Sequence, residues 1–198
     1  MSIKAIVRTY IQNVRPYAQT ELNWFRQQPS LESAIEKAAF AVNSQGKRHP
    51  HQRRLKKSTL EEAHQTLLSN IKEIQHCKSF DDLFTLVEML LNPIVGAGEL
   101  YTYDTALRIG AKLNLLPTAV YLHAGTRNGA KTLGFNSRTK MIEMAALPSE
   151  LQQLEPYEVE DILCIFKDNF RQANTEPIEN TGCYQPSPTG DASPCYQG

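Results

Sequence analysis

Hydrophobic residues recur at helical spacing along most of the chain. From Ile3 onward, apolar side chains follow the i, i+3, i+4 pattern that places them on one face of a helix, and this pattern returns in several separate segments. The run from Phe80 to Leu91 is apolar on nearly all sides, which is typical of a central, buried helix. Residues 118–123, "TAVYLH", fit either a short strand or a buried turn. The pattern predicts an all-α domain of seven or eight helices over residues 1–174.

Polar and helix-breaking residues mark where several of these helices begin or end. Pro16 lies within the first apolar pattern and predicts a kink or a break there. Ser79 is expected to cap the helix that starts at the next residue. Ser58 and Glu61 fit a capping box, in which a serine and a glutamate three residues later satisfy the first backbone amides of a helix. We therefore expect a further helix to begin after Ser58.

Composition changes after residue 174. The segment from Thr175 to Gly198 contains four prolines and three glycines, and it has few apolar residues to offset the entropy lost on ordering. We expect a flexible, disordered tail there. The tripeptide Cys-Tyr-Gln occurs twice in this tail, at 183–185 and 195–197, which leaves open a role in docking or metal binding.

The charged residues are unevenly distributed. The chain has 21 basic and 21 acidic residues, but the segment "GKRHPHQRRLKK" from Gly46 to Lys57, here called the basic segment, contains six basic residues and no acid. Such a cluster attracts polyanions through the release of counterions, whatever their sequence. The alternative is a solvated, mobile loop before a helix. The six residues are Lys47, Arg48, Arg53, Arg54, Lys56 and Lys57.

Two further pairs of basic residues have helical spacing. Arg108 and Lys112 are four residues apart, as are Arg127 and Lys131, so each pair shares one face of a helix. We expect both pairs to bind nucleic acid beside the glycine turn at residues 96–98, with the basic segment extending the contact.

Two glycines frame Ala97 between two helical patterns. Glycine readily takes backbone conformations with positive φ, and a side chain at Gly98 would damage backbone binding if the hairpin needs positive φ there. A turn that then opens a helix directs several unpaired backbone N–H groups outward, and these groups attract phosphate. Gly96, Ala97 and Gly98 are therefore predicted to bind a nucleic-acid backbone, with a purely structural turn as the alternative. A dinucleotide-binding loop is rejected because Tyr101 stands where its third glycine would be.

A family resemblance appears in this region. The stretch "LNPIVGAGELYTYDTALRIGAKL", followed by "PTAVYLHAGTRNGAKTLGF", resembles the hairpin half of the helix-hairpin-helix DNA glycosylases, the endonuclease III-like superfamily. The resemblance covers about residues 80–135: a glycine-rich hairpin, a helix, and a basic helix that ends at a leucine–glycine pair. It implies a helix-hairpin-helix motif at about residues 80–115 that holds the nucleic-acid backbone.

The positions that carry catalysis in that family are not matched. Its lyase members have a catalytic lysine two residues after the second hairpin glycine, where this chain has Leu100. The family's essential aspartate stands two residues before a histidine, and if that histidine is His123 the position is Tyr121. The four-cysteine pattern of an iron–sulfur cluster does not follow. The resemblance therefore implies shared architecture and backbone binding, without base excision.

Other side chains with catalytic or metal-binding chemistry are isolated in the sequence. Asp104 and His123 are the candidates for catalysis, but Asp104 also suits a salt bridge on its own helix, and His123 a packed, hydrogen-bonded role. His49 and His51 lack partners at the spacing that a closed metal site needs. We predict neither a metal nor a cofactor.

Membrane and compartment signals are weak. The chain has no run of about 18 apolar residues, so a membrane-spanning helix is not expected. Four cysteines without a secretory signal favour a reduced, cytoplasmic protein.

Three functional hypotheses follow from these observations. The first is a non-catalytic protein that binds the backbone of nucleic acid, DNA in the first place, through the hairpin and the basic residues. The second is an enzyme of the glycosylase, lyase or nuclease type whose catalytic residues are displaced. The third is a helical protein-interaction module that docks a partner through the basic segment or the tail.

Overall fold

The apolar faces predicted from the sequence pack into a largely helical structure. The computed structural model describes the backbone of residues 1–173 and the side chains up to residue 170. This part of the chain contains ten α-helices, two short 3-10 helices and one two-stranded sheet. The all-α class is confirmed, and there are more helices than the predicted seven or eight because three helical segments are each divided in two. The tail predicted for residues 175–198 lies outside the described residues.

The elements follow one another along the chain with short connections. The α-helices are α1 (Ile3–Asn13), α2 (Arg15–Arg26), α3 (Leu31–Ala39), α4 (Lys57–Ser69), α5 (Ile71–His76), α6 (Phe80–Leu91), α7 (Glu99–Leu113), α8 (Ala124–Thr132), α9 (Pro156–Ile165) and α10 (Lys167–Ala173). The 3-10 helices are η1 (Pro50–Gln52) and η2 (Met144–Ala146). Strands β1 (Ala119–Tyr121) and β2 (Met141–Glu143) pair antiparallel, with Val120 opposite Ile142.

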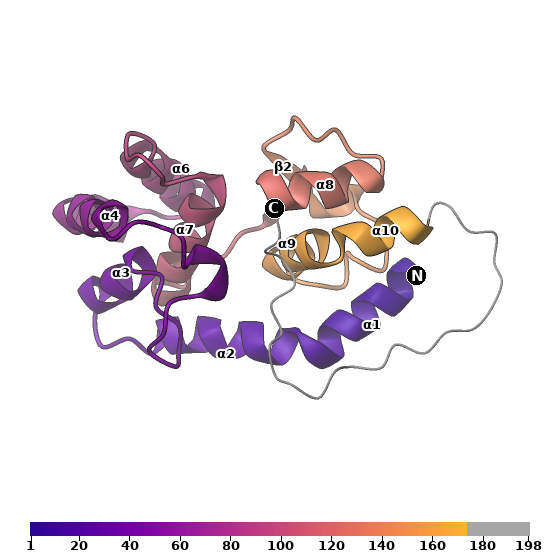
Figure 1. Cartoon of the computed structure of the whole chain (residues 1–198), viewed down its shortest axis with the longest axis horizontal. Helices are drawn as coiled ribbons and strands as arrows, with labels where there is room; N and C mark the ends of the chain where they lie inside the picture. The colour runs from indigo at the N-terminus through magenta and orange to yellow at the C-terminus, as the bar shows by residue number, and fades with distance from the viewer. Residues whose placement is uncertain (174–198) are drawn as a thin grey trace.

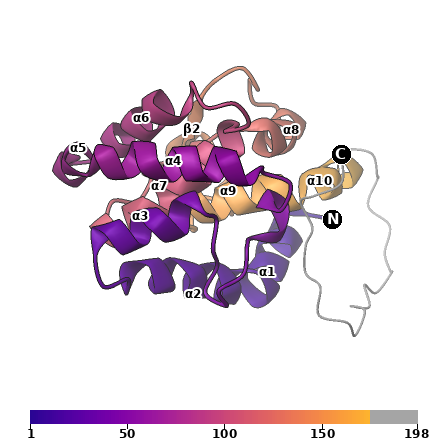
Figure 2. The same ribbon diagram turned by 60° about the vertical axis from the view of Figure 1, so that its left-hand side comes forward.

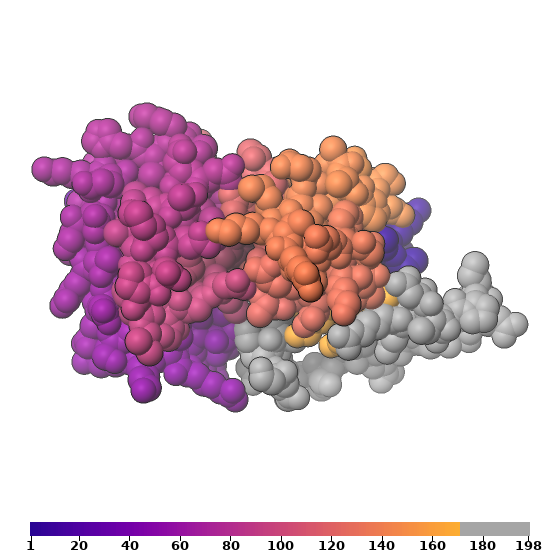
Figure 3. Space-filling view, turned by 90° about the horizontal axis from the view of Figure 1, so that it is seen from above, coloured from indigo at the N-terminus to yellow at the C-terminus, as the bar shows by residue number. Residues whose placement is uncertain are grey.

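The helices form two groups with separate hydrophobic cores, here called the first and the second lobe. The first lobe contains α2 to α7, around a core that includes Leu83 and Ile109. The second lobe contains α1, α8 to α10 and the sheet, around a core that includes Ile6 and Leu163. Figure 1 shows the two lobes side by side, with α1 and α2 running in succession beneath both. Seen from above in Figure 3, the purple first lobe meets the orange second lobe along a seam.

Pro16 accounts for the division of the first apolar pattern into two helices. It lies in the first turn of α2, where its missing N–H would have had no helical partner. The chain turns at Val14, which is both the C-cap of α1 and the N-cap of α2. The break predicted at Pro16 is therefore confirmed, and it allows α1 to join the second lobe while α2 joins the first.

Helix α7 is the centre of the first lobe. It packs against α2, α3 and α6, and Figure 2 shows it behind α3 and α4. Most of its surface is buried, so most of its polar side chains face other parts of the protein. Some of them reach the connection between α3 and α4, and others reach the seam with the second lobe.

Polar contacts between helices connect the two lobes. The Arg15 guanidinium of α2 binds the Glu158 carboxylate of α9 through two hydrogen bonds, of 2.6 and 2.9 Å. The Tyr10 hydroxyl of α1 donates to Asp161 Oδ2 on α9 at 2.9 Å. The ion pair links α2 to the second lobe, and the tyrosine bond fixes α1 to the same helix.

Candidate nucleic-acid interface and the cleft between the lobes

The turn over residues 92–98 joins α6 to α7 at the surface. Its two glycines have different conformations: φ is +95° at Gly96 and −77° at Gly98. The condition of positive φ at Gly98 is therefore not met, because its extended backbone suits any residue. Gly96 is the position that favours glycine, and a Cβ there would also lie 3.2 Å from Thr59 Oγ1.

The start of α7 has no side-chain cap. Its N-cap residue is Gly98, which has no side chain that could accept a hydrogen bond from the first backbone amides. The preceding turn is exposed, and the Val95 side chain at its tip is 89 % exposed. The positive end of the α7 dipole thus lies beside an accessible stretch of backbone, with Glu99 as the acidic residue of the first turn.

The end of the basic segment lies against this turn. The Thr59 hydroxyl, in the first turn of α4, donates to the Val95 carbonyl oxygen at 2.9 Å. Lys56 and Lys57 are the N-cap and first residue of the same helix, and both are exposed. Lys57 forms an ion pair of 3.2 Å with Glu61. Two lysines therefore stand within one helical turn of the contact with the 92–98 turn.

The rest of the basic segment is folded against the first lobe. Val42 and Arg48 form an antiparallel β-bridge, and Arg48 Nη1 donates to the Leu55 carbonyl oxygen at 3.1 Å, which closes the segment on itself. Arg48 thus has a structural role. The exposed cations of the segment are Lys47, Arg53, Arg54, Lys56 and Lys57.

Arg108 and Lys112 do not belong to an exposed basic face. Arg108 is 6 % exposed, and its guanidinium donates to Gln52 Oε1 at 2.9 Å and to Asp104 Oδ2 at 3.2 Å. The Lys112 ammonium donates to the carbonyl oxygen of Gln28, just beyond the end of α2. Their helical spacing is as predicted, but the face that they share is turned toward the protein.

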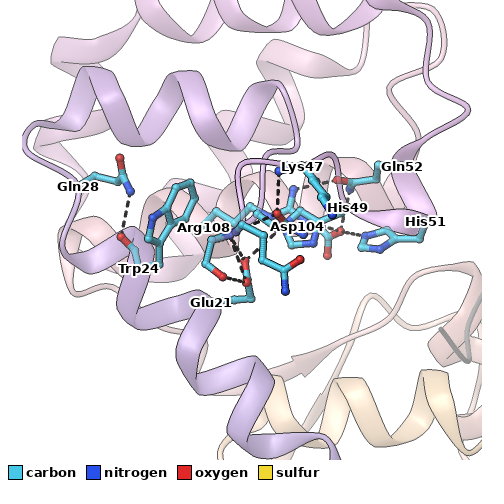
Figure 4. Close-up of polar contacts among 12 residues, drawn as sticks. Glu21, Trp24, Gln28, Lys47, His49, His51, Gln52, Asp104 and Arg108 are labelled. Atoms are coloured by element: carbon cyan, nitrogen blue, oxygen red, sulfur yellow. Dashed lines mark hydrogen bonds and ion pairs between the residues drawn. The ribbon is translucent and has the colours of Figure 1, made fainter. Parts of the chain in front are cut away.

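Asp104 is the centre of a polar cluster between α7 and the basic segment. Its Oδ2 atom accepts hydrogen bonds from His51 Nε2 at 2.6 Å and from Gln52 Nε2 at 2.8 Å, besides the contact with Arg108. Figure 4 shows these side chains converging on the carboxylate. Burial opposes ionisation of Asp104, but Arg108 and His51 outweigh it and lower the pKa of the carboxyl group. Asp104 therefore stays charged and anchors the segment.

His49 extends the cluster toward α2. Its Nε2 atom is 3.8 Å from Glu21 Oε2 and has no hydrogen-bond partner among the described residues, while the Glu21 carboxylate accepts from the amide and the hydroxyl of Ser44. Burial and the nearby Arg108 guanidinium lower the pKa of His49 to about 2. His49 is therefore neutral at ordinary pH.

A cleft of about 90 Å³ lies between the two lobes. Tyr103 of α7 lines it, is 2 % exposed, and its hydroxyl has no hydrogen-bond partner in the described part of the chain. Burial and the Glu160 carboxylate raise the pKa of Tyr103 well above its ordinary value, so the hydroxyl keeps its proton. Other residues that line the cleft include Phe84, Glu88, Glu99, Tyr121, His123, Arg127 and Lys140.

His123 is paired with a carboxylate at the inner end of this cleft. Its Nε2 atom hydrogen-bonds Glu160 of α9, and its ring lies 5.8 Å from the Tyr103 ring, between centroids. Burial opposes the charged form of His123, but the Glu160 carboxylate outweighs it and raises the pKa of the imidazole. The two sequence candidates for catalysis are therefore in different places, because Asp104 is held in the cluster around the basic segment.

Tyr121, two residues before His123, has a structural contact. The Tyr121 hydroxyl donates to the Asp81 carboxylate of α6, so this residue joins β1 to the first lobe. Its ring packs 4.6 Å from the Phe84 ring, between centroids, in the wall of the cleft.

Two ion pairs cross the rim of the cleft. Arg127 of α8 binds Glu99 at 2.9 Å, and Lys140 binds Glu88 of α6 at 3.0 Å. Arg127 thus lies beside the 92–98 turn, whereas Lys131, one turn further along α8, is exposed. Of the two basic pairs identified in the sequence, this one reaches the turn.

Several functional candidates were missed by the sequence reasoning. Tyr103 and Glu160 lie within helical patterns, and Lys140 precedes a short strand, so spacing alone did not single them out. Glu160 gave no usable signal either, because the acidic residues of its helix lie off the apolar face formed by Val159, Ile162 and Leu163, where charged side chains are usually exposed.

Comparisons with protein-family models, with curated proteins and with solved structures found no match. Within residues 1–173, no helix combines the length and the apolar character needed to cross a membrane. In the same range, no group of three or more histidine, cysteine, aspartate or glutamate side chains could hold a metal ion.

Proposed function

We propose that the protein binds the backbone of nucleic acid, duplex DNA in the first place, at the 92–98 turn and the start of α4, without cleaving it. The observation that carries this proposal is the hydrogen bond from Thr59 to Val95, which sets two lysines beside the uncapped start of α7. Backbone amides and lysines are two kinds of phosphate contact, and neither reads the sequence of the bases. The cytoplasmic setting expected from the sequence belongs to the same proposal.

The other exposed cations would widen the contact. Arg53 and Arg54 precede Lys56 in the basic segment, and Lys131 is an exposed residue of α8, one turn beyond Arg127. With about four to six phosphates contacted, the logarithm of the binding constant for duplex DNA should fall against the logarithm of the salt concentration with a slope near −4 to −5.

A salt titration of DNA binding tests the proposal. Replacing Lys56 and Lys57 by glutamine should make this slope shallower by about 2, because two phosphate contacts are lost. The matched control replaces Lys4 and Arg8, two exposed cations of α1, and should leave the slope unchanged. Absence of binding at low salt, or a flat salt dependence, would contradict nucleic-acid binding and favour the protein-interaction module.

The enzyme remains the second candidate because the cleft brings His123, Glu160 and Tyr103 together. A buried imidazole with a raised pKa beside a protonated hydroxyl is an arrangement suited to proton transfer. The assay is incubation with duplex DNA that contains damaged bases and an abasic site. Release of a base or cleavage of a strand that is lost in His123→Gln and kept in Asp104→Asn would replace the non-catalytic proposal.

A further inference from the structure

Arg127 and Glu99 form an ion pair where the second lobe meets the 92–98 turn. Arg127 Nη2 donates to Glu99 Oε1 at 2.9 Å. Glu99 is the first residue of α7, so its carboxylate belongs to the same turn as the uncapped amides. A negative charge at this position is favoured both by the guanidinium and by the helix dipole.

The two partners differ in how firmly they are held. Arg127 Nη1 donates to the carbonyl oxygens of Ser137 and Thr139, at 3.0 and 3.1 Å, which fixes the guanidinium independently of Glu99. The Arg127 side chain is 26 % exposed, whereas that of Glu99 is 58 % exposed. The arginine is therefore positioned by the fold, and the glutamate can leave without moving it.

We propose that Glu99 occupies the place of a phosphate group in the unbound protein, and that a nucleic-acid backbone displaces it from Arg127. The inference rests on the proposed function and concerns the regulation of that same surface. Carboxylate and phosphate oxygens both accept charge-assisted hydrogen bonds from a guanidinium, and Nη2 is the atom that donates to Glu99. The phosphate would meet an arginine already in position, while Glu99 turns into solvent and its repulsion of the backbone is removed.

The second ion pair at the cleft provides a contrast. Lys140 contacts Glu88 at 3.0 Å, but its side chain is 73 % exposed. A long, exposed lysine keeps its freedom with or without Glu88, so removing that carboxylate frees no positioned cation. Glu88→Gln therefore removes the same charge as Glu99→Gln at a neighbouring site. It is the matched control, because its carboxylate does not hold the place of a phosphate.

The experiment measures the affinity of the full chain for a duplex DNA of random sequence. Glu99→Gln should bind roughly three- to tenfold tighter than the unmodified protein at 50 mM salt. The slope of log binding constant against log salt concentration should be steeper by up to about 0.9. In the unmodified protein, binding liberates a carboxylate that takes up a cation, and Glu99→Gln lacks this uptake. Glu88→Gln should change the affinity by less than half as much on a logarithmic scale.

A double-mutant cycle then assigns the gain to Arg127. The increase caused by Glu99→Gln should vanish when Arg127 is replaced by glutamine, and it should persist in part with Arg127→Lys, which keeps the charge. Thermal melting of each variant shows whether it is folded. If Arg127→Gln melts at a lower temperature than the unmodified protein, the cycle relies on Arg127→Lys alone.

The outcomes separate the two proposals. Binding by the unmodified protein with no difference between Glu99→Gln and Glu88→Gln overturns the exchange and leaves the proposed function standing. The exchange is also overturned if Glu99→Gln still raises the affinity in the absence of Arg127. Removal of a negative charge beside the start of α7 would then explain the effect. If neither the unmodified protein nor Glu99→Gln binds DNA at 50 mM salt, both proposals are wrong.

Discussion

A buried histidine lies on each of two sides of α7, and the pKa values of the two histidines are shifted in opposite directions. On the side of the basic segment, burial and the Arg108 guanidinium lower the pKa of His49 to about 2 and keep the imidazole neutral. On the side of the cleft, the Glu160 carboxylate overcomes burial and raises the pKa of His123, which favours the charged form. Both residues are nearly inaccessible to solvent.

The difference shows that a directly hydrogen-bonded carboxylate can overcome the effect of burial on a histidine pKa, whereas a more distant one does not. Glu21 is close to His49, but its carboxylate accepts hydrogen bonds from Ser44 and lies 3.8 Å from the imidazole. Glu160 is in direct hydrogen-bond contact with His123. The first arrangement anchors a surface segment to α7 and α2. The second places a hydrogen-bonded histidine and glutamate beside the cleft.

The largest expected effect comes from breaking the pair in the cleft. Glu160→Gln removes the partner of a buried cation and should lower the free energy of unfolding by roughly 3 kcal/mol at pH 6. The pair contributes fully below the unfolded histidine pKa of about 6.5, and its contribution is lost as the pH rises through the raised folded pKa of His123. Urea unfolding at pH 6 and pH 9 should therefore show a smaller deficit at pH 9.

The matched control for that variant is Glu143→Gln, at an exposed position of β2. It should stay within about 0.5 kcal/mol of the unmodified protein. Equal losses in the two variants would show that the pair adds nothing beyond an exposed carboxylate.

The next effect separates His49 from His123 by its pH dependence. Below about pH 6.5 the unfolded chain protonates His49 and the folded chain does not, so acidification should cost about 1.4 kcal/mol per pH unit from this residue. His49→Gln should remove this component from the acid limb of a plot of stability against pH. Guanidinium unfolding between pH 7 and pH 4.5 measures it, and an unchanged acid limb would mean that His49 accepts a proton in the folded state.

The smallest effect concerns the turn at which α7 begins, between the two sides. Gly96→Ala forces a side chain into a left-handed backbone and toward Thr59, and it should destabilise by roughly 1–2 kcal/mol. Gly98→Ala should change stability by less than about 0.5 kcal/mol, because Gly98 has an ordinary φ and open space around it. Thermal melting of the two variants tests which glycine the turn requires. A lower melting temperature for Gly98→Ala than for Gly96→Ala would contradict the prediction.

Local signals predicted α6 well and α4 less well. Ser79 and Asp82 form a complete capping box at the start of α6, and that helix begins and ends at the residues expected from the pattern. The box expected at Ser58 and Glu61 is absent: α4 begins at Lys57, with Lys56 as its N-cap. Thr59 donates to Val95, 36 residues further along the chain, and this tertiary contact determines how the start of α4 is seated.

The candidate site was predictable in its parts and not in its assembly. The glycine turn and the cations of the basic segment stand out in the sequence, since both depend on residue type. The spacing of Arg108 and Lys112 identified a common helix face, but it contained no information on whether that face points outward. Tyr103 and Glu160 become a site only when the two lobes meet, which depends on contacts distant in sequence.

The break at Val14 has a consequence for the order in which the chain can fold during synthesis. Because of this break, α1 packs in a core whose other helices are synthesised much later than α1. The partner of Tyr10, Asp161, lies 151 residues further along the chain. At 5–20 residues per second, the apolar face of α1, with Ile6 and Tyr10, emerges roughly 8 to 30 seconds before α9 exists to cover it. The first lobe can fold on the ribosome in that interval, whereas the second lobe is completed only when the two ends of the helical region meet.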